Sequence, residues 1–93
     1  MSNTATITVT IQNKLGLHAR PAMMFVETAS KWPCDISVRR ATQDEVLDGK
    51  SIMQMMMLAA TRGAQIEITA TGEQANEALE SLAKLIESKF DEE

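Results

Sequence analysis

The segment from Thr4 to Ile11 reads TATITVTI, a strict alternation of threonine with an apolar residue. Successive side chains on a β-strand point to opposite faces, so this period of two predicts a strand with one buried face and one solvated face. Sheets with one solvated face are mainly antiparallel, and helices cover their apolar side. The segment therefore indicates an α+β fold with an open-faced sheet.

The rest of the chain supplies the other elements of such a fold in a simple order. Helical spacing, strand alternation and turn residues mark each element. The predicted elements are a strand over residues 4–11, a helix over 19–31, strands over 36–40 and 46–47, a helix over 51–62, a strand over 66–70 and a helix beginning near Glu73. We therefore expect one domain over residues 1–93, an open-faced β-sandwich in which a four-stranded antiparallel sheet carries three helices on one face.

The two longer predicted helices each carry an apolar stripe that should face the sheet. The stripe residues are Ala22, Phe25, Val26 and Ala29 in the first helix, and Ala75, Ala78, Leu79, Leu82 and Ile86 in the last. The one cysteine, Cys34, has no disulfide partner in the chain and no metal-ligand spacing around it. We expect it to be a reduced thiol in or beside the core.

Charge limits the classes of function that the chain can serve. A net charge of −4 and few aromatic residues (3%) disfavour nucleic-acid binding, which needs a basic surface and stacking partners. Residues 1–62 carry a net charge of +2, from seven basic and five acidic side chains. Residues 63–93 carry a net charge of −6, from two basic and eight acidic side chains. A bipolar surface is one interpretation, and a solvated acidic helix face followed by a frayed tail over residues 91–93 is the simpler one.

No segment resembles a membrane span or a leader. Apolar runs stay well below the roughly 20 residues that cross a bilayer, and Met1 to Thr8 lack the basic start and apolar stretch of a signal peptide. We expect a cytoplasmic monomer with no direct membrane insertion and no nucleic-acid partner.

The segment Gly16-Leu17-His18-Ala19-Arg20-Pro21-Ala22 places a histidine where a loop turns into the first helix. The first backbone N–H groups of a helix lack internal partners and point outward at the positive end of its dipole, where they bind anions. Pro21 suits this turn because it removes an N–H that would be unpaired, and Arg20 adds a planar cation that matches phosphate oxygens. A histidine at a helix start is otherwise a cap or a surface residue. In this setting His18 can attack phosphorus as a neutral imidazole and then carry the phosphoryl group.

Two motifs resemble segments of the histidine-containing phosphocarrier (HPr) family of the bacterial sugar phosphotransferase system. The His18 segment is similar to the family's active-site segment, and Gly49-Lys50-Ser51-Ile52-Met53 is similar to its regulatory-serine segment. The resemblance covers nearly the whole chain and implies four antiparallel strands backed by three helices. It also implies that enzyme I, charged from phosphoenolpyruvate, phosphorylates His18 on Nδ1, with Arg20 as the phosphate partner. Delivery to an enzyme IIA domain would follow, so the protein would be a stoichiometric carrier rather than an enzyme.

Ser51 has two interpretations that do not exclude each other. With Gln54 three residues on, it fits a capping box at the start of the second helix. In proteins of the resembled family the matching serine is also phosphorylated in many bacteria, and a helix start accommodates the added charge. The resemblance thus implies regulation at Ser51 where the organism has an HPr kinase/phosphorylase.

Six of the seven methionines gather in two short stretches, at positions 23 and 24 and at positions 53 and 55–57. Methionines usually pack a core, but flexible thioethers also suit a surface that meets several partners. In the resembled family the turn after the histidine and the short helix form the docking face. We therefore expect docking through Met23, Met24, Ile52, Met53 and Met56, with Arg62 at its edge.

Three classes of function follow from these features. A phosphocarrier for sugar uptake is the leading hypothesis, and a related carrier in a nitrogen-linked or purely regulatory branch is the alternative; both use His18. A small ligand-binding or structural domain would leave the arrangement of His18, Arg20 and Ser51 unexplained. Neither a metal nor an organic cofactor is implied, because no ligand spacing or glycine-rich phosphate loop is present.

Overall fold

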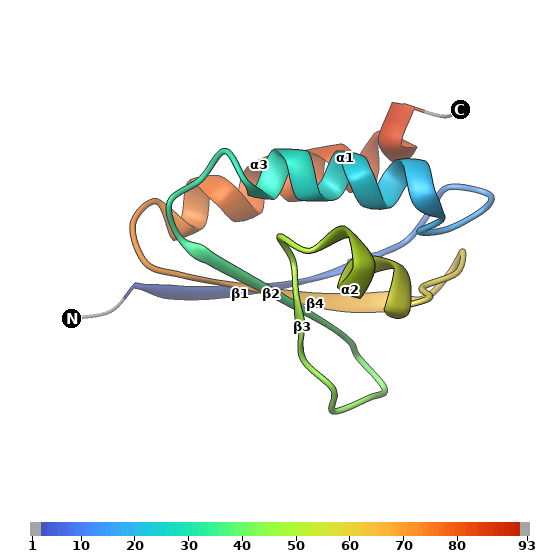
Figure 1. The fold of residues 1–93 in the computed structure, drawn as a ribbon, viewed down its shortest axis with the longest axis horizontal. Coiled ribbons are helices and arrows are strands. Elements are labelled where there is room, and N and C mark those ends of the chain that lie inside the picture. Colours follow the sequence, from blue (N-terminus) through green and yellow to red (C-terminus); the bar gives the residue numbers. More distant parts are fainter. Residues whose placement is uncertain (1–2, 92–93) are drawn as a thin grey trace.

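The computed structural model describes residues 3–91 and has two layers, a twisted sheet and the helices that cover one of its faces (Figure 1). Glu92 and Glu93, which belong to the predicted frayed tail, lie outside the described residues, as do Met1 and Ser2. The strands are β1 (Thr4–Thr10), β2 (Asp35–Arg40), β3 (Leu47–Asp48) and β4 (Gln65–Thr71). The helices are α1 (Ala19–Ala29), α2 (Ile52–Met57) and α3 (Ala75–Glu87), and a turn over Lys89–Asp91 follows α3.

The four strands form one antiparallel sheet in the order β1-β4-β2-β3. Ile68 of the inner strand β4 lies opposite Ile7 on one side and Val38 on the other, so apolar residues meet on the covered face. On the open face the threonines of β1 are exposed, and the hydroxyls of Thr6 and Thr69 lie 3.1 Å apart across the strands. The alternation that begins the chain is thus confirmed, and with it the open-faced α+β architecture.

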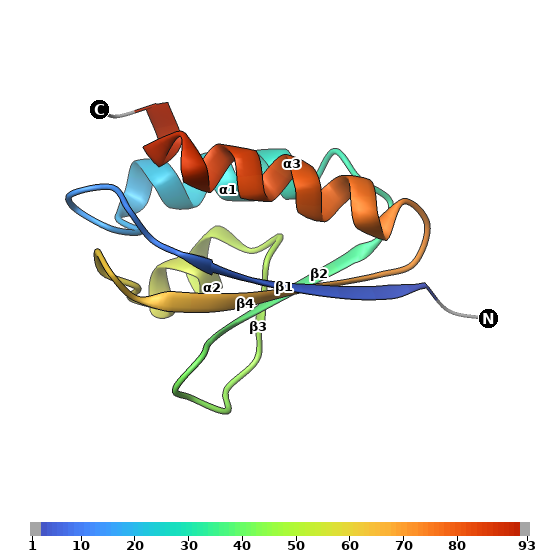
Figure 2. The same cartoon turned by 180° about the vertical axis from the view of Figure 1, so that it is seen from behind.

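The core lies between the sheet and the helices α1 and α3, which Figure 2 shows side by side over the strands. Every residue of the two predicted apolar stripes is buried, as is the free thiol of Cys34. Asp91, which the prediction assigned to a frayed tail, instead ends an ordered turn after α3, because its N–H donates to Ser88 O (3.0 Å) and the preceding ring of Phe90 is fully buried. Within the described residues, no helix has both the length and the apolar character that a membrane crossing requires.

The boundaries of two helices differ from the prediction by two residues. The first helix was expected to reach Lys31, but α1 ends at Ala29 because the chain tightens there into turns in which Lys31 N–H bonds to Thr28 and Trp32 N–H to Ala29. The last helix was expected near Glu73, but Gln74 adopts a φ of +63°, so helical geometry begins at Ala75. Both errors lie at helix ends, where local hydrogen bonds decide the boundary.

The predicted second helix is much too long. Instead of continuing to Arg62, α2 ends at Met57, because Ala59 adopts a φ of +52° and bonds back to Met56 (N···O 3.1 Å). The following residues continue as a loop, in which Leu58 and Ala60 are buried. The third strand is also displaced by one residue, to Leu47–Asp48, and Val46 is exposed.

Candidate functional site

His18 is the N-cap residue of α1, with extended backbone angles (φ −78°, ψ −172°). Its carbonyl accepts the first helical hydrogen bond, from Ala22 N–H at 3.0 Å, and its half-buried side chain makes no capping bond to the helix. The N–H groups of Ala19 and Arg20 belong to the first turn, which has no internal acceptors for them, and Pro21 has none to offer. The helix start therefore presents two backbone donors beside the imidazole.

Arg20 lies on this first turn, and its side chain is exposed. The first turn of α1 carries no acidic side chain that would compete for the guanidinium. Two adjacent donors, a guanidinium and an imidazole can together hold a phosphoryl group, because charge-assisted bonds at a helix start favour an anion. The structure thus places both residues that the sequence predicted for this chemistry at the start of one helix.

The loop before His18 is tied to the loop after α2. Leu17 N–H donates to Ala60 O (2.9 Å), and farther back Ile11 exchanges bonds with Ala64 and Gly63 (2.9 and 2.8 Å). Gly16 adopts a φ of +69° and lies so close to Ala60 that a Cβ would be 2.4 Å from its carbonyl oxygen. The position of His18 therefore depends on contacts far away in the sequence.

The two sequence stretches that form and contact the His18 loop are basic, although the chain as a whole is acidic. Residues 3–26 contain no aspartate or glutamate, and neither do residues 49–66, which include α2 and the loop bonded to the His18 segment. The basic residues of these two stretches are Lys14, Arg20, Lys50 and Arg62. Basic stretches of this kind suit phosphate and acidic partner surfaces.

Ser51 is the N-cap of α2, where its Oγ accepts a hydrogen bond from Gln54 N–H (3.2 Å). Of the two reciprocal hydrogen bonds of the predicted capping box, only this one forms. The Gln54 side chain does not return to the backbone of Ser51 but accepts from Asp48 N–H (2.8 Å), because Ser51 N–H already donates to Asp48 O (3.2 Å). Ser51 lies at the far end of α2 from the contact with the His18 loop, and a helix of six residues is about 9 Å long.

Exposed apolar side chains from α1, α2 and the His18 loop form what we call the methionine patch. Four of its members were predicted, namely Met23, Ile52, Met53 and Met56. Met24, the fifth predicted member, is half-buried and packs against the core. Two further apolar residues of these segments, Leu15 (70% exposed) and Met57 (61%), are also exposed; they were not predicted, and we include them in the patch. Arg62 is exposed, in the loop bonded to the His18 segment.

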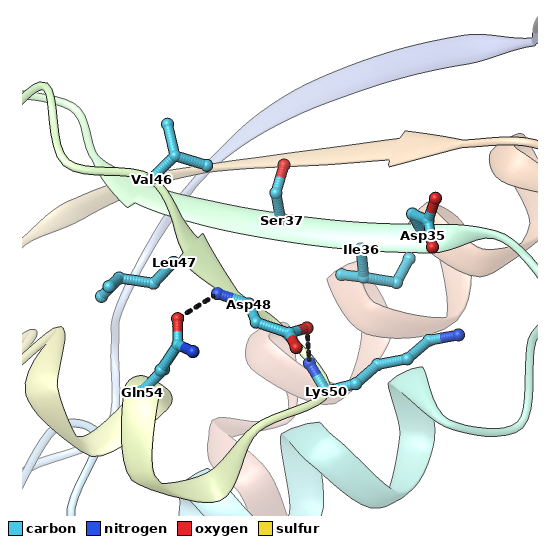
Figure 3. Close-up of a pocket in the computed structure, with 8 residues that line it drawn as sticks. All are labelled: Asp35, Ile36, Ser37, Val46, Leu47, Asp48, Lys50 and Gln54. Atoms are coloured by element: carbon cyan, nitrogen blue, oxygen red, sulfur yellow. Dashed lines mark hydrogen bonds between the residues drawn. The ribbon is translucent and has the colours of Figure 1, made fainter.

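A groove of about 470 Å³ lies between β2, β3 and the start of α2, and no residue of the His18 segment lines it (Figure 3). Three of its residues are bonded to one another: Asp48 accepts from Lys50 N–H at 2.9 Å and donates its own N–H to Gln54. The Lys50 ammonium leaves the groove to donate to Trp32 O (2.8 Å). We interpret these bonds as the support of the Ser51 turn. Among the described residues, no three His, Cys, Asp or Glu side chains gather as a metal site requires.

Comparison with known proteins gives a consistent result. The protein-family model described as the PTS HPr component phosphorylation site matches residues 5–88. The phosphocarrier protein HPr of Pseudomonas putida is 51% identical over 84 residues, which are 90% of this chain and 92% of that protein. The phosphocarrier protein NPr of Escherichia coli K12 is 41% identical over 86 residues, 92% of this chain and 94% of that one.

A solved structure agrees with these sequence matches. The crystal structure of HPr from Thermoanaerobacter tengcongensis superposes with a TM-score of 0.89 at 44% identity, over 96% of this chain and 98% of that one. Sequence similarity and shape thus point to the same proteins over nearly the whole chain. The chain belongs to the HPr and NPr family of phosphocarrier proteins of the phosphotransferase system.

Proposed function

We propose that His18 accepts a phosphoryl group from phosphorylated enzyme I and passes it to an enzyme IIA domain. The observation that carries this proposal is the position of His18, the one histidine of the chain, at the N-cap of α1 beside two backbone donors and Arg20. A carrier needs a nucleophile that is accessible to two different proteins in turn. A half-buried side chain at the exposed start of a helix meets that need better than one at the bottom of a pocket.

The transfer step forms a phosphorus–nitrogen bond at His18 and breaks the bond that joins phosphorus to the donor group of enzyme I. The lone pair of His18 Nδ1, the nitrogen implied by the family resemblance, attacks phosphorus while the bond to the donor group breaks. The electron pair of that bond returns to the donor atom, and the phosphoryl group keeps its three oxygens. The N–H groups of Ala19 and Arg20 and the Arg20 guanidinium stabilise the negative charge of the phosphoryl group during and after the transfer.

We propose the methionine patch as the surface that meets both partners. Flexible thioethers can repack against different surfaces, which suits a protein that binds a donor and an acceptor in turn. The absence of acidic residues from the two stretches around it favours partners with an apolar centre and an acidic rim. Both encounters would take place in the cytoplasm, where enzyme I is charged from phosphoenolpyruvate.

Ser51 is the proposed site of regulation by an HPr kinase/phosphorylase. Its hydroxyl lies at the start of α2, the helix that supplies Ile52, Met53 and Met56 to the methionine patch. A phosphate at this position would add negative charge to the edge of a surface whose neighbours are cations. Repulsion from an acidic partner would then weaken the encounter and leave the chemistry at His18 unchanged.

Two branches of the phosphotransferase system remain as candidates. The higher identity to an HPr of Pseudomonas, 51%, favours the sugar branch. The 41% identity to NPr of Escherichia coli supports a nitrogen-linked or regulatory branch as the second candidate. The downstream acceptor distinguishes the two, since sugar specificity belongs to the acceptor domains.

A reconstituted relay tests the proposal. The chain is incubated with enzyme I, phosphoenolpyruvate and, in separate reactions, an enzyme IIA of sugar transport or its nitrogen-branch counterpart from the same organism. We expect phosphorylation of one acceptor class to depend on this chain and to disappear with His18→Ala. Phosphorylation of an acceptor by the His18→Ala variant at the wild-type rate would refute the assignment.

A further inference from the structure

We propose that Asn13 is a positioning residue for His18, which rests on the proposed role of His18 as phosphoryl acceptor. Asn13 lies five residues before the histidine, in the loop between β1 and α1, and was not among the residues predicted to bind or transfer the phosphoryl group. Within residues 3–91 it is the one polar side chain among the buried ones, with none of its surface exposed. Its place in an otherwise apolar set of buried residues calls for an explanation.

The hydrogen bonds of Asn13 lead directly to the backbone of His18. The side-chain amide Nδ2 donates to Gly16 O at 2.7 Å, and the same carbonyl accepts from His18 N–H at 3.0 Å. Gly16 N–H in turn donates to Asn13 O (3.2 Å). One carbonyl oxygen therefore joins the buried amide to the residue that carries the imidazole.

The peptide unit between Gly16 and Leu17 is held at both of its polar ends. Its carbonyl is fixed by Asn13 and His18, and its N–H donates to Ala60 O at 2.9 Å. The close approach of Gly16 to Ala60 leaves no room for the unit to move toward the loop after α2. Without the Asn13 amide the carbonyl would lose this side-chain donor, and the peptide could rotate about the remaining contacts. His18 is bonded to that carbonyl and would move with it.

Stability alone does not account for an asparagine at this position. Burying an amide removes it from water, and the hydrogen bond that it then forms returns little more than this cost. A leucine has a similar branched shape and would fill the space without any such cost. Placement of a reacting group is a different matter, because a displacement of about 1 Å can slow a reaction up to a hundredfold.

The proposal is tested with two variants of similar shape, Asn13→Leu and Asn13→Asp, which both remove the amide donor. Leu79→Ala is the control for a general loss of stability, since Leu79 is buried in the first half of α3, a helix that begins at the end of the molecule opposite to the start of α1 (Figure 1). We expect each Asn13 variant to lower the maximal rate of phosphoryl transfer from enzyme I by roughly tenfold to a hundredfold. The KM for enzyme I should stay within about twofold, because the methionine patch is unchanged.

Amide hydrogen exchange and imidazole signals, both followed by NMR, supply a readout that needs no phosphorylation. In the unphosphorylated wild-type protein the Leu17 and His18 amides should exchange slowly. In the Asn13 variants these two amides should exchange at least about tenfold faster relative to the amides of β4, and the His18 imidazole signals should be displaced. In Leu79→Ala the ratio of the two exchange rates should equal that of the wild-type protein. Fast exchange of both amides in the wild-type protein would overturn the proposal even if neither variant folds. An Asn13 variant that keeps the wild-type imidazole signals and maximal rate would also overturn it. The same holds for an Asn13 variant whose loss of rate only equals that of Leu79→Ala. If the wild-type protein accepts no phosphoryl group, the proposed function fails, and the exchange measurement still decides whether Asn13 positions His18.

Discussion

Replacing Gly16 with alanine should destabilise the domain and displace His18, because the added methyl group has no space. Its Cβ would lie 2.4 Å from Ala60 O and 2.9 Å from the Cα of Thr61, distances that real Cβ atoms do not adopt. Both neighbours are backbone atoms, so no side chain can rotate away. The loop must therefore separate from residues 60 and 61, and the hydrogen bond from Leu17 N–H to Ala60 O would be lost with that movement.

The magnitude follows from two contributions. An alanine at a φ of +69° costs about 1–2 kcal/mol relative to glycine, since its Cβ approaches the next carbonyl oxygen. Loss of the Leu17 bond leaves a buried donor and acceptor unpaired, at about 1–3 kcal/mol. The expected loss in free energy of unfolding is therefore about 2–5 kcal/mol. For a domain of this size, each kcal/mol lowers the Tm by about 4–8 °C.

Gly63→Ala is the matched control for this measurement. Gly63 also has a positive φ (+90°), but no atom lies within 4 Å of the position that its Cβ would take. Its backbone cost should equal or exceed that of Gly16→Ala, because +90° lies farther from the left-handed minimum near +57°. Thermal and urea unfolding should show Gly16→Ala to be the less stable variant by about 1–3 kcal/mol. Equal losses in the two variants would show that the contact with Ala60 does not hold the His18 loop.

Three further predictions concern the surface around His18. Arg20→Ala should leave the Tm unchanged, because the side chain is exposed, but should slow phosphoryl transfer about tenfold or more through loss of a charge-assisted bond; transfer at the wild-type rate would assign Arg20 to solvent. Ser51→Asp should raise the KM for enzyme I by more than it lowers the maximal rate, with an equal or higher Tm, whereas Ser51→Ala should cost about 1 kcal/mol of stability through loss of the cap. An unchanged KM, or a lower Tm in the aspartate variant, would leave Ser51 as a cap alone. Met53→Lys should weaken binding of enzyme I, measured by titration calorimetry, without loss of stability, because Met53 is 76% exposed. Met55→Ala, at a fully buried position of the same helix, should instead cost about 2–5 kcal/mol of stability. Undiminished affinity in Met53→Lys would remove Met53 from the docking surface.

The fold was predictable where the apolar pattern is unambiguous. The threonine alternation of β1 and the stripes of α1 and α3 each fit one period only, so the sheet, its open face and the layer of helices followed from them. The second helix shows the opposite case. Its three consecutive methionines, 55 to 57, fit any helical phase, so the burial of Met55 alone could not be read from spacing. The end of this helix depends on the left-handed conformation of Ala59, for which alanine gives no signal.

The site was predictable in its residue types but not in its support. A histidine and an arginine on the first turn of a helix are visible in the sequence, as is the serine that caps α2. Leu15 and Asn13, in contrast, reverse the usual rule, since the apolar residue is exposed and the polar one is buried. Their positions depend on how the loop packs against residues 60–64, a contact between segments nearly 50 residues apart that no local pattern records.

The most direct test of the proposed function is the mass of the intact chain after incubation with enzyme I and phosphoenolpyruvate. The wild-type protein should gain the mass of one phosphoryl group, and brief treatment with acid should remove it, because phosphorus–nitrogen bonds to histidine are labile in acid. The His18→Ala variant should gain nothing under the same conditions, and its Tm should show that it remains folded. Phosphorylation that survives acid, or that persists in His18→Ala, would contradict the assignment of His18 as the phosphoryl carrier.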